Sequence, residues 1–382
     1  MKKFVELLTG NRVNLLIGAG TSSDIIPTLS IPGTNLSLVD LLESEQIIQE
    51  NREKLIVYYY HKWVLAGETQ NIRKHICYEE VLNEYVEFIL SLINFLSNES
   101  TNSPRRINIF TTNFDPVFEM VFDEILEKDE VDCFFCDGGR GFVKRRFSTK
   151  NFYLNVTHSG YFDKYKREIP TINLLKMHGS ITWMNTSGLI EFDPTDSTYV
   201  IKKINKAVEI IGKDAIDLID EAIYSKNTSE NGNNNQPFTE INSRLNQVEV
   251  EKKKLGASLN ELKDLPIINP MSWKFEHTVF DENYYQLIRS LSYELENENS
   301  VLIALGSSFS DPHINNIIKR SLTNPKLLPI FICYDKESLE KIKKEFPNKQ
   351  CRFLPSEIEF AEEKRGTLGY LTEKIITGDF DE

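Results

Sequence analysis

Six short apolar runs, separated by stretches of helical periodicity, constrain the fold of this 382-residue chain more than any other feature. Most of them are rich in β-branched or aromatic residues, which is typical of strands buried on both faces. The runs are Val13–Ile17, Ile107–Thr111, Thr171–Met177, Val301–Leu305, Leu328–Cys333 and Cys351–Leu354. Helical patterns occur at Leu38–Gln49, Glu79–Leu96, Pro116–Glu127, Tyr284–Leu295, Ile314–Leu322 and Lys336–Glu345. This alternation predicts an α/β fold with a doubly wound parallel sheet between two layers of helices.

Two regions interrupt the alternation within what we expect to be one domain spanning 1–382. Residues 128–170 are rich in glycine, aromatic and charged residues and predict a small, irregular inserted module. Residues 195–265 carry two helical patterns, Val200–Ser225 and Phe238–Lys263, and predict a helical insertion that packs on a neighbouring subunit. The polar tract between the two patterns has too few apolar residues to pack, so we expect a flexible loop at 227–237.

Composition narrows the classes of function. The formal net charge of -13, from 44 Lys and Arg against 57 Asp and Glu, argues against direct binding of nucleic acid. No segment approaches the roughly 20 apolar residues of a membrane span, and the N-terminal segment lacks the features of a signal peptide. Five scattered cysteines fit a reducing compartment. We therefore expect a cytoplasmic protein that binds neither nucleic acid nor membrane.

A glycine turn follows the first apolar run. It consists of Gly18, Ala19, Gly20, Thr21 and Ser22. Such a turn lets the backbone approach a pyrophosphate, and the N–H groups at the start of a following helix point at the phosphates. The two hydroxyl groups add further donors. A tight strand-to-helix turn without a ligand explains the same residues equally well.

The second run ends in a block that includes Thr112, Asn113 and Asp115. The amide of Asn113 can hold a ribose hydroxyl or a water molecule without a change of charge. Asp115 precedes Pro116, the pattern of a helix cap followed by proline at the first helical position. Capping is thus the favoured role of Asp115, although a carboxylate at a strand end can also contact a ligand.

His178, followed by Gly179, ends the third run. An imidazole in this position suits a general base or an acceptor for a ribose hydroxyl, whereas a lone histidine is by default a packed core residue. The fourth run is followed by Gly306, Ser307 and Ser308, which repeat the pattern of the first turn and predict contacts to the far ribose or a phosphate.

Three polar residues lie close to the later strands, and one of them has two competing interpretations. Asp311 is interpreted as a helix cap, and His313 as a surface residue in the first turn of that helix. Asp335, just past the fifth run, suits either the adenosine ribose hydroxyl or another helix cap.

Cys133 and Cys136 have the spacing of a zinc knuckle. A structural zinc site needs four ligands, and no second cysteine pair lies nearby. We therefore expect no zinc and no other metal site.

In combination and order, four blocks resemble the sirtuin (silent-information-regulator) superfamily, in its divergent prokaryotic branch. They are the glycine turn at 18–22, the Thr-x-Asn-x-Asp block at 111–115, the His-Gly pair at 178–179 and the Gly-Ser-Ser block at 306–308. The resemblance implies a Rossmann-like, sirtuin-type sheet that binds NAD in extended form. It also implies that Asn113 and His178 lie at the nicotinamide ribose. We then expect the pyrophosphate over the glycine turn and the adenosine near Ser307, Ser308 and Asp335.

The chain departs from the protein-deacetylating sirtuins, which carry two Cys-x-x-Cys pairs and usually glutamine where this chain has Thr112. The divergent branch resembles NAD-hydrolysing effectors of bacterial anti-phage systems, and a chain of this size resembles the subunit that pairs with a HerA-like hexameric ATPase. The resemblance therefore implies a homo-oligomeric NAD glycohydrolase that uses NAD as substrate and is gated by assembly with such an ATPase. Two alternatives stay open, namely a non-catalytic scaffold that binds NAD or ADP-ribose, and an NAD-dependent protein deacylase. The residues do not separate hydrolysis from cyclisation.

Overall fold

The computed structural model describes residues 4–31, 34, 36–100, 103–128, 131–193, 195–224, 236–268 and 280–378. Contacts within the chain divide it into two compact units. The first unit comprises Met1–Ile25, His75–His178 and Glu282–Glu382, and the second comprises Ile26–Lys74 and Gly179–Asp281. The 128–170 module belongs to the first unit and the 195–265 region to the second.

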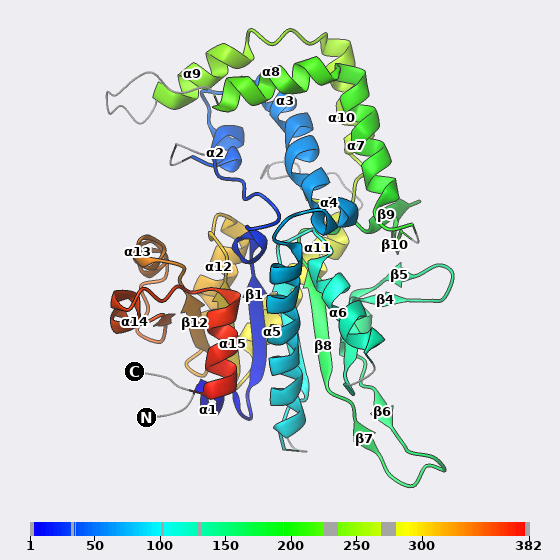
Figure 1. Ribbon diagram of the computed structural model, residues 1–382, viewed down its shortest axis with the longest axis vertical. Helices are drawn as coiled ribbons and strands as arrows, with labels where there is room; N and C mark the ends of the chain where they lie inside the picture. Colours follow the sequence, from blue (N-terminus) through cyan, green and yellow to red (C-terminus); the bar gives the residue numbers. More distant parts are fainter. Residues whose placement is uncertain are drawn as a thin grey trace. The chain divides into compact units, whose positions relative to one another are not determined.

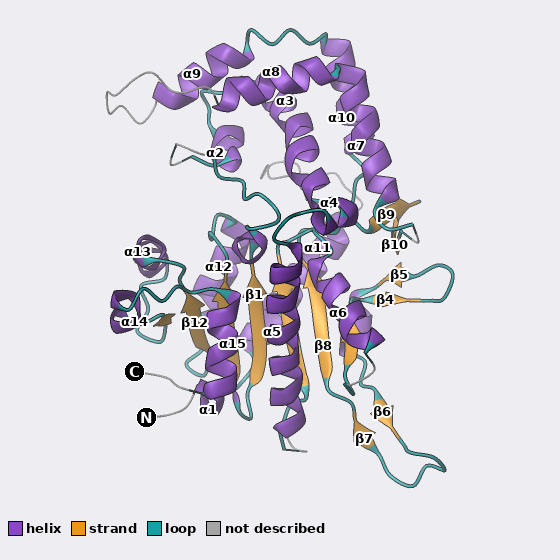
Figure 2. Ribbon diagram, viewed as in Figure 1, coloured by secondary structure: helices purple, strands orange, loops and turns teal. Residues whose placement is uncertain are grey.

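A seven-stranded sheet forms the centre of the first unit (Figures 1 and 2). Its strands are β1 (Arg12–Ile17), β2 (Arg106–Thr111), β3 (Phe134–Cys136), β8 (Thr171–Lys176), β11 (Ser300–Leu305), β12 (Leu328–Ile332) and β13 (Arg352–Leu354). Their order is β13-β12-β11-β1-β2-β8-β3, and every neighbouring pair is parallel. All six predicted runs form strands of this sheet. The α/β class and the parallel sheet are confirmed, and the topology is consistent with a Rossmann-like, doubly wound fold.

The direction of the chain through the sheet reverses beside β1. From β1 the chain adds β2, the edge strand β3 and then β8 between them on one side, and it later returns to place β11, β12 and β13 on the other side. Helices cover both faces, since α5 (Tyr78–Asn98) and α15 (Leu368–Thr377) lie in front of the sheet in Figure 1, and α11 (Phe280–Glu296) and α12 (Pro312–Ser321) lie behind it. In such sheets ligands bind at the carboxyl ends of the strands where the order reverses, here β1 and β11.

The remaining elements of the first unit are short helices and hairpin strands. They are α1 (Phe4–Leu8), η1 (Ala19–Ser22), α6 (Val117–Glu127), α13 (Lys336–Glu345), α14 (Glu357–Ala361), η4 (Thr149–Tyr153), β4 (Gly139–Arg140), β5 (Arg146–Phe147), β6 (Thr157–His158) and β7 (Arg167–Glu168). Strands β4 and β5 pair antiparallel, as do β6 and β7. The 128–170 module thus contains two short hairpins.

A row of buried asparagines crosses the middle of the sheet. Asn108 of β2 donates from Nδ2 to Oδ1 of Asn14 on β1 at 2.9 Å, and Asn173 of β8 donates in the same way to Asn108 at 2.8 Å. Asn14 in turn donates to the hydroxyl of Ser300 on β11 at 3.1 Å. Because a slip in register would leave these buried amides unpaired, the row helps to define the alignment of the four central strands.

The second unit is mainly helical. Its elements are α2 (Leu38–Glu43), α3 (Gln49–Tyr59), the π-turn η2 (Tyr60–Val64), η3 (Leu65–Gly67), α4 (Thr69–Arg73), β9 (Trp183–Thr186), β10 (Leu189–Phe192), α7 (Thr198–Ile211), α8 (Lys213–Tyr224), α9 (Gln236–Leu245) and α10 (Lys252–Leu262). Strands β9 and β10 form an antiparallel hairpin. Within the described parts of both units, no helix has the length and apolar character needed to cross a membrane.

Three predicted helices are wrong as continuous elements. The pattern at 38–49 contains α2 and only the first residue of α3, because α2 ends at Glu43 and the backbone is extended at Ser44. The pattern at 200–225 breaks at Gly212, whose φ of +92° ends α7. The pattern at 238–263 gives α9 and α10, and side chains of α3 satisfy carbonyls at the end of α9, since Lys54 donates to Leu245 O at 3.1 Å. The predicted flexible loop at 227–237 lies largely outside the described residues.

Candidate functional site

The strand register brings the sequence motifs to one edge of the sheet. Ile17 pairs with both Leu305 and Thr111, and Thr111 pairs with Lys176. The glycine turns that follow β1 and β11 therefore begin side by side. Asn113 and His178 each lie two residues beyond the paired ends of β2 and β8, on neighbouring strands. The structure thus places all four motifs at the carboxyl edge.

The glycines after β1 and β11 pack against each other. A Cβ on Gly18 would lie 2.5 Å from the carbonyl oxygen of Gly306, and a Cβ on Gly20 would lie 3.0 Å from the Cα of Gly306. The Gly20 N–H donates to the Gly306 carbonyl at 2.9 Å. This close approach requires glycine at both turns without any ligand. Residues Ala19–Ser22 themselves form a single 3-10 turn, η1, instead of leading directly into an α-helix, so the contact of Gly18–Ser22 with a pyrophosphate stays a prediction.

Tyr85 of α5 holds the glycine turn in place. Its hydroxyl donates to Thr21 Oγ1 at 2.7 Å, and that oxygen donates to the Gly18 carbonyl at 2.9 Å. Burial, followed by the charge of Asp115, raises the pKa of the Tyr85 phenol well above its usual range. Tyr85 was missed by sequence reasoning because its position in the helical pattern is that of an ordinary core residue.

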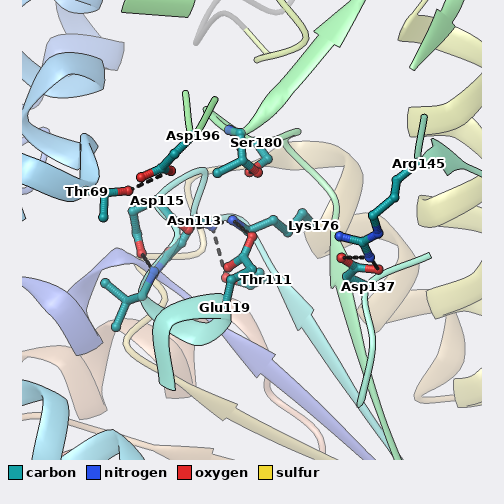
Figure 3. A network of polar contacts seen from close by, with 12 residues as sticks. Thr69, Thr111, Asn113, Asp115, Glu119, Asp137, Arg145, Lys176, Ser180 and Asp196 are labelled. Carbon is teal, nitrogen blue, oxygen red and sulfur yellow. Dashed lines mark hydrogen bonds and ion pairs between the residues drawn. The ribbon is translucent and has the colours of Figure 1, made fainter. Parts of the chain in front are cut away.

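Asn113 is held so that its amide oxygen has no partner. Thr111 Oγ1 accepts the Asn113 backbone N–H at 3.0 Å (Figure 3). It also donates to the Ile17 carbonyl at 3.0 Å, which fixes the turn after β2 against the end of β1. Asn113 is only 5% exposed, and its Oδ1 meets no hydrogen-bond donor among the residues that the structure describes. A buried amide oxygen without a donor carries a desolvation penalty, which a bound ligand or water would relieve.

A buried charge cluster lies beneath the same turn. Asp115 Oδ1 accepts the Val117 N–H at 3.1 Å, but α6 begins at Val117 and Pro116 is its N-cap, without a side-chain capping bond, so Asp115 is not the N-cap that the sequence predicts. Lys176, at the end of β8, donates to the Asp115 carbonyl at 2.5 Å and to Glu119 Oε1 at 2.6 Å. Burial raises the pKa of both carboxyl groups, and the Lys176 cation opposes this rise.

Replacement of Lys176 by methionine should make stability strongly dependent on pH. A carboxyl group whose pKa is raised by folding stabilises the protein below its unfolded pKa, and that contribution disappears as pH rises through the folded pKa. Without the cation, the pKa values of Asp115 and Glu119 rise further. We expect a loss of about 3 kcal/mol in the free energy of unfolding at neutral pH and a smaller loss near about pH 4.

Urea unfolding of wild-type and K176M protein across this pH range measures the effect. The matched control is K128M. It removes the exposed cation that pairs with Glu124, a residue of α6 like Glu119, and we expect it to change the free energy of unfolding by less than about 0.5 kcal/mol. A pH-independent difference for K176M would mean that the cation does not compensate the buried carboxylates.

His178 is paired with Asp311. The imidazole Nε2 lies 3.0 Å from Asp311 Oδ2. The other carboxylate oxygen, Oδ1, accepts the backbone N–H groups of His313 at 2.7 Å and Ile314 at 3.2 Å, so Asp311 caps α12 as predicted. Burial opposes ionisation of Asp311, but the hydrogen bonds from His178 and from these N–H groups outweigh it and hold the pKa below its usual value. His313 is exposed, as predicted.

The remaining predicted contacts lie at the same edge with differing exposure. Ser307 and Thr112 are half-buried, and Ser308 is exposed and bonded to Ser310 at 2.8 Å. Asp335 caps α13, because its Oδ1 accepts the Ser338 N–H at 2.8 Å. Capping is thus confirmed for Asp335, and its contact with a ribose stays a prediction.

The two cysteines of the Cys-x-x-Cys pair lie at the outermost strand of the sheet, β3, with Cys133 directly before it and Cys136 at its end. Cys136 ends β3, which pairs with β8, and burial raises the pKa of the Cys133 thiol to about 12. The described ranges contain no group of three or more histidine, cysteine or acidic side chains arranged to hold a metal ion.

Comparison with known proteins gives no match, either to a protein-family model or to a curated protein.

Proposed function

We propose that the protein is an NAD glycohydrolase whose site is the carboxyl edge of the first unit's sheet. The reaction converts NAD⁺ and water into nicotinamide, ADP-ribose and a proton. Nicotinamide leaves with the electron pair of the glycosidic bond, and water adds to the ribose C1′. Because the transition state is oxocarbenium-like and the leaving group is good, the site has to orient the ribose and the water more than to supply a strong acid.

One observation carries the proposal, namely the buried Oδ1 of Asn113, which has no hydrogen-bond donor within the described part of the chain. The free energy lost by burying this oxygen is regained only when a donor approaches it, and a ribose hydroxyl or a water molecule is such a donor. Its position next to the reversal of strand order is where α/β sheets of this class bind nucleotides.

The two candidate catalytic residues have complementary roles in the proposal. Asn113 orients the attacking water and a ribose hydroxyl, and His178 accepts the proton that is released as water adds. Gly18, Ala19, Gly20, Thr21 and Ser22 lie along the pyrophosphate. Thr112, Asp115, Gly306, Ser307, Ser308 and Asp335 complete the contacts to NAD.

The biological setting of the proposal comes from the sirtuin resemblance. On that basis residues 1–382 are one sirtuin-type NAD-binding domain with insertions at 128–170 and 195–265, and the protein assembles as a homo-oligomer with a HerA-like hexameric ATPase. Depletion of NAD on phage infection is the proposed effector activity. Gating by the partner fits this activity, because constant loss of NAD would be toxic to the cell.

The test is incubation of the purified chain with NAD and an acetylated peptide, with and without a candidate HerA-like ATPase. We expect free nicotinamide and ADP-ribose in equal amounts, and cyclic ADP-ribose would instead indicate cyclisation. O-acyl-ADP-ribose would identify a deacylase. Intact NAD with measurable binding under both conditions would identify a non-catalytic scaffold and would contradict the proposal.

A further inference from the structure

Asp311 does more than cap a helix. Its Oδ1 is occupied by the two backbone N–H groups at the start of α12, whereas Oδ2 faces the imidazole of His178. Pro312, at the first helical position, has the backbone angle that a helix requires and helps to hold Asp311 in place. The carboxylate is therefore fixed by the helix on one side and available to the histidine on the other.

The contact spans the carboxyl edge of the sheet. His178 follows β8 and Asp311 follows β11, and these strands are separated by β2 and β1. Three strand spacings correspond to about 14 Å, so the two loops approach each other above the strand ends that carry Asn113 and the glycine turn. The hydrogen bond thus anchors His178 to the far side of the proposed site.

Tyr284 of α11 packs beside this pair. Its ring centroid lies 6.1 Å from that of His178, and only 8% of its surface is exposed. Burial, followed by the charge of Asp311, raises the pKa of the Tyr284 phenol. The neutral phenol shields the pair from solvent and strengthens the interaction between imidazole and carboxylate.

An ionised carboxylate can only accept hydrogen bonds. Asp311 is held ionised by the N–H groups and the positive end of α12. The nitrogen of His178 that faces it, Nε2, must therefore carry the proton, which leaves Nδ1 of the neutral ring as an acceptor.

We infer that Asp311 is a positioning residue that selects the Nε2–H tautomer of His178, so that Nδ1 is the atom that accepts a proton from the ribose or the attacking water. This inference rests on the proposed function for the identity of the substrate. The tautomer itself is a property of the protein without substrate, so the two can be tested separately.

The test compares Asp311→Asn with wild-type protein labelled with ¹⁵N in its histidines. Asparagine still caps α12 through its oxygen but presents an NH₂ group to His178, which then accepts through Nε2 and carries its proton on Nδ1. Long-range ¹H–¹⁵N spectra, in which His178→Gln assigns the ring, are expected to show Nε2–H in the wild type and Nδ1–H in D311N. In the active assembly we expect kcat to fall about 100-fold, with KM nearly unchanged.

Two further variants separate positioning from capping. Asp311→Ser retains a capping oxygen but is too short to reach the imidazole, so we expect a mixture of tautomers and a similar loss of kcat with an intact fold by circular dichroism. Asp137→Asn makes the same carboxylate-to-amide change in the exposed pair with Arg145, and we expect no effect on either measurement.

The outcomes are distinguishable. An unchanged tautomer in D311N, or a changed tautomer with full turnover, would overturn the inference and leave Asp311 as a helix cap. The expected change of tautomer in a protein that never cleaves NAD would support the inferred positioning of His178 and remove the proposed function.

Discussion

Asn113→Ala is expected to lower kcat for NAD cleavage about 1,000-fold or more while leaving the protein as stable as the wild type to within about 1 kcal/mol. The amide would be lost from the reacting ribose and water. Stability is retained because the side-chain oxygen has no hydrogen-bond partner to lose among the residues that the structure describes. The backbone N–H of residue 113 still donates to Thr111 Oγ1, so the turn after β2 is preserved.

Product release from NAD and urea unfolding of the same preparation measure the two effects. The matched control is Asn98→Ala, which removes an exposed amide bonded only to Asn94 among the described contacts, and it should change neither quantity. A large loss of stability in N113A with a proportional loss of activity would show that Asn113 supports the fold rather than the substrate.

Gly306→Ala should destabilise the protein by about 3 kcal/mol and disrupt the site at the same time. The residue has a φ of +66°, which an alanine adopts only with strain. Its Cβ would also lie 2.8 Å from the backbone N of Thr21 and 3.0 Å from the carbonyl oxygen of Gly18. Because these atoms are backbone, they cannot move aside without separating the two glycine turns.

Gly10→Ala is the control that separates the backbone strain of a positive φ from the steric clash of the added Cβ. Gly10 has a similar φ of +75°, and nothing lies within 4 Å of the added Cβ. Its expected loss is therefore about 1 kcal/mol, and the difference between the two variants measures the packing of the turns. Equal destabilisation in urea unfolding would mean that the approach of Gly306 to the first turn contributes nothing.

Six of the seven strands of the central sheet were predicted, whereas β3 and the short hairpin strands were not. A buried strand in a parallel sheet reads as a continuous apolar run, and all six runs appear in the sheet within a residue or so of their expected bounds. Helix breaks at Ser44 and Gly212 follow from local backbone angles that a hydrophobic pattern does not record. At the end of α9, the Leu245 carbonyl accepts a hydrogen bond from Lys54, which is 191 residues away in sequence.

In the candidate site, too, some residues could be predicted from the sequence and others could not. Asn113 and His178 stood out because polar residues at the ends of buried strands are unusual, and the strand register does place them at the ends of neighbouring strands. From the sequence, Lys176 was interpreted only as the end of a strand and Asp311 only as a helix cap. Tyr85 and Tyr284 were interpreted as ordinary core residues of helices. None of these residues has a sequence signal for its partner, because each contact joins segments far apart in the chain.

The sequence by itself determined which segments become strands and that their polar ends carry the motifs, since burial on both faces selects apolar residues and strand ends tolerate polar ones. Only the tertiary structure decided the order of the strands, and with it the meeting of Gly18 with Gly306 and of His178 with Asp311. The physical reason is that strand order and loop contacts arise from packing between segments separated by over a hundred residues, which no local pattern of side chains encodes.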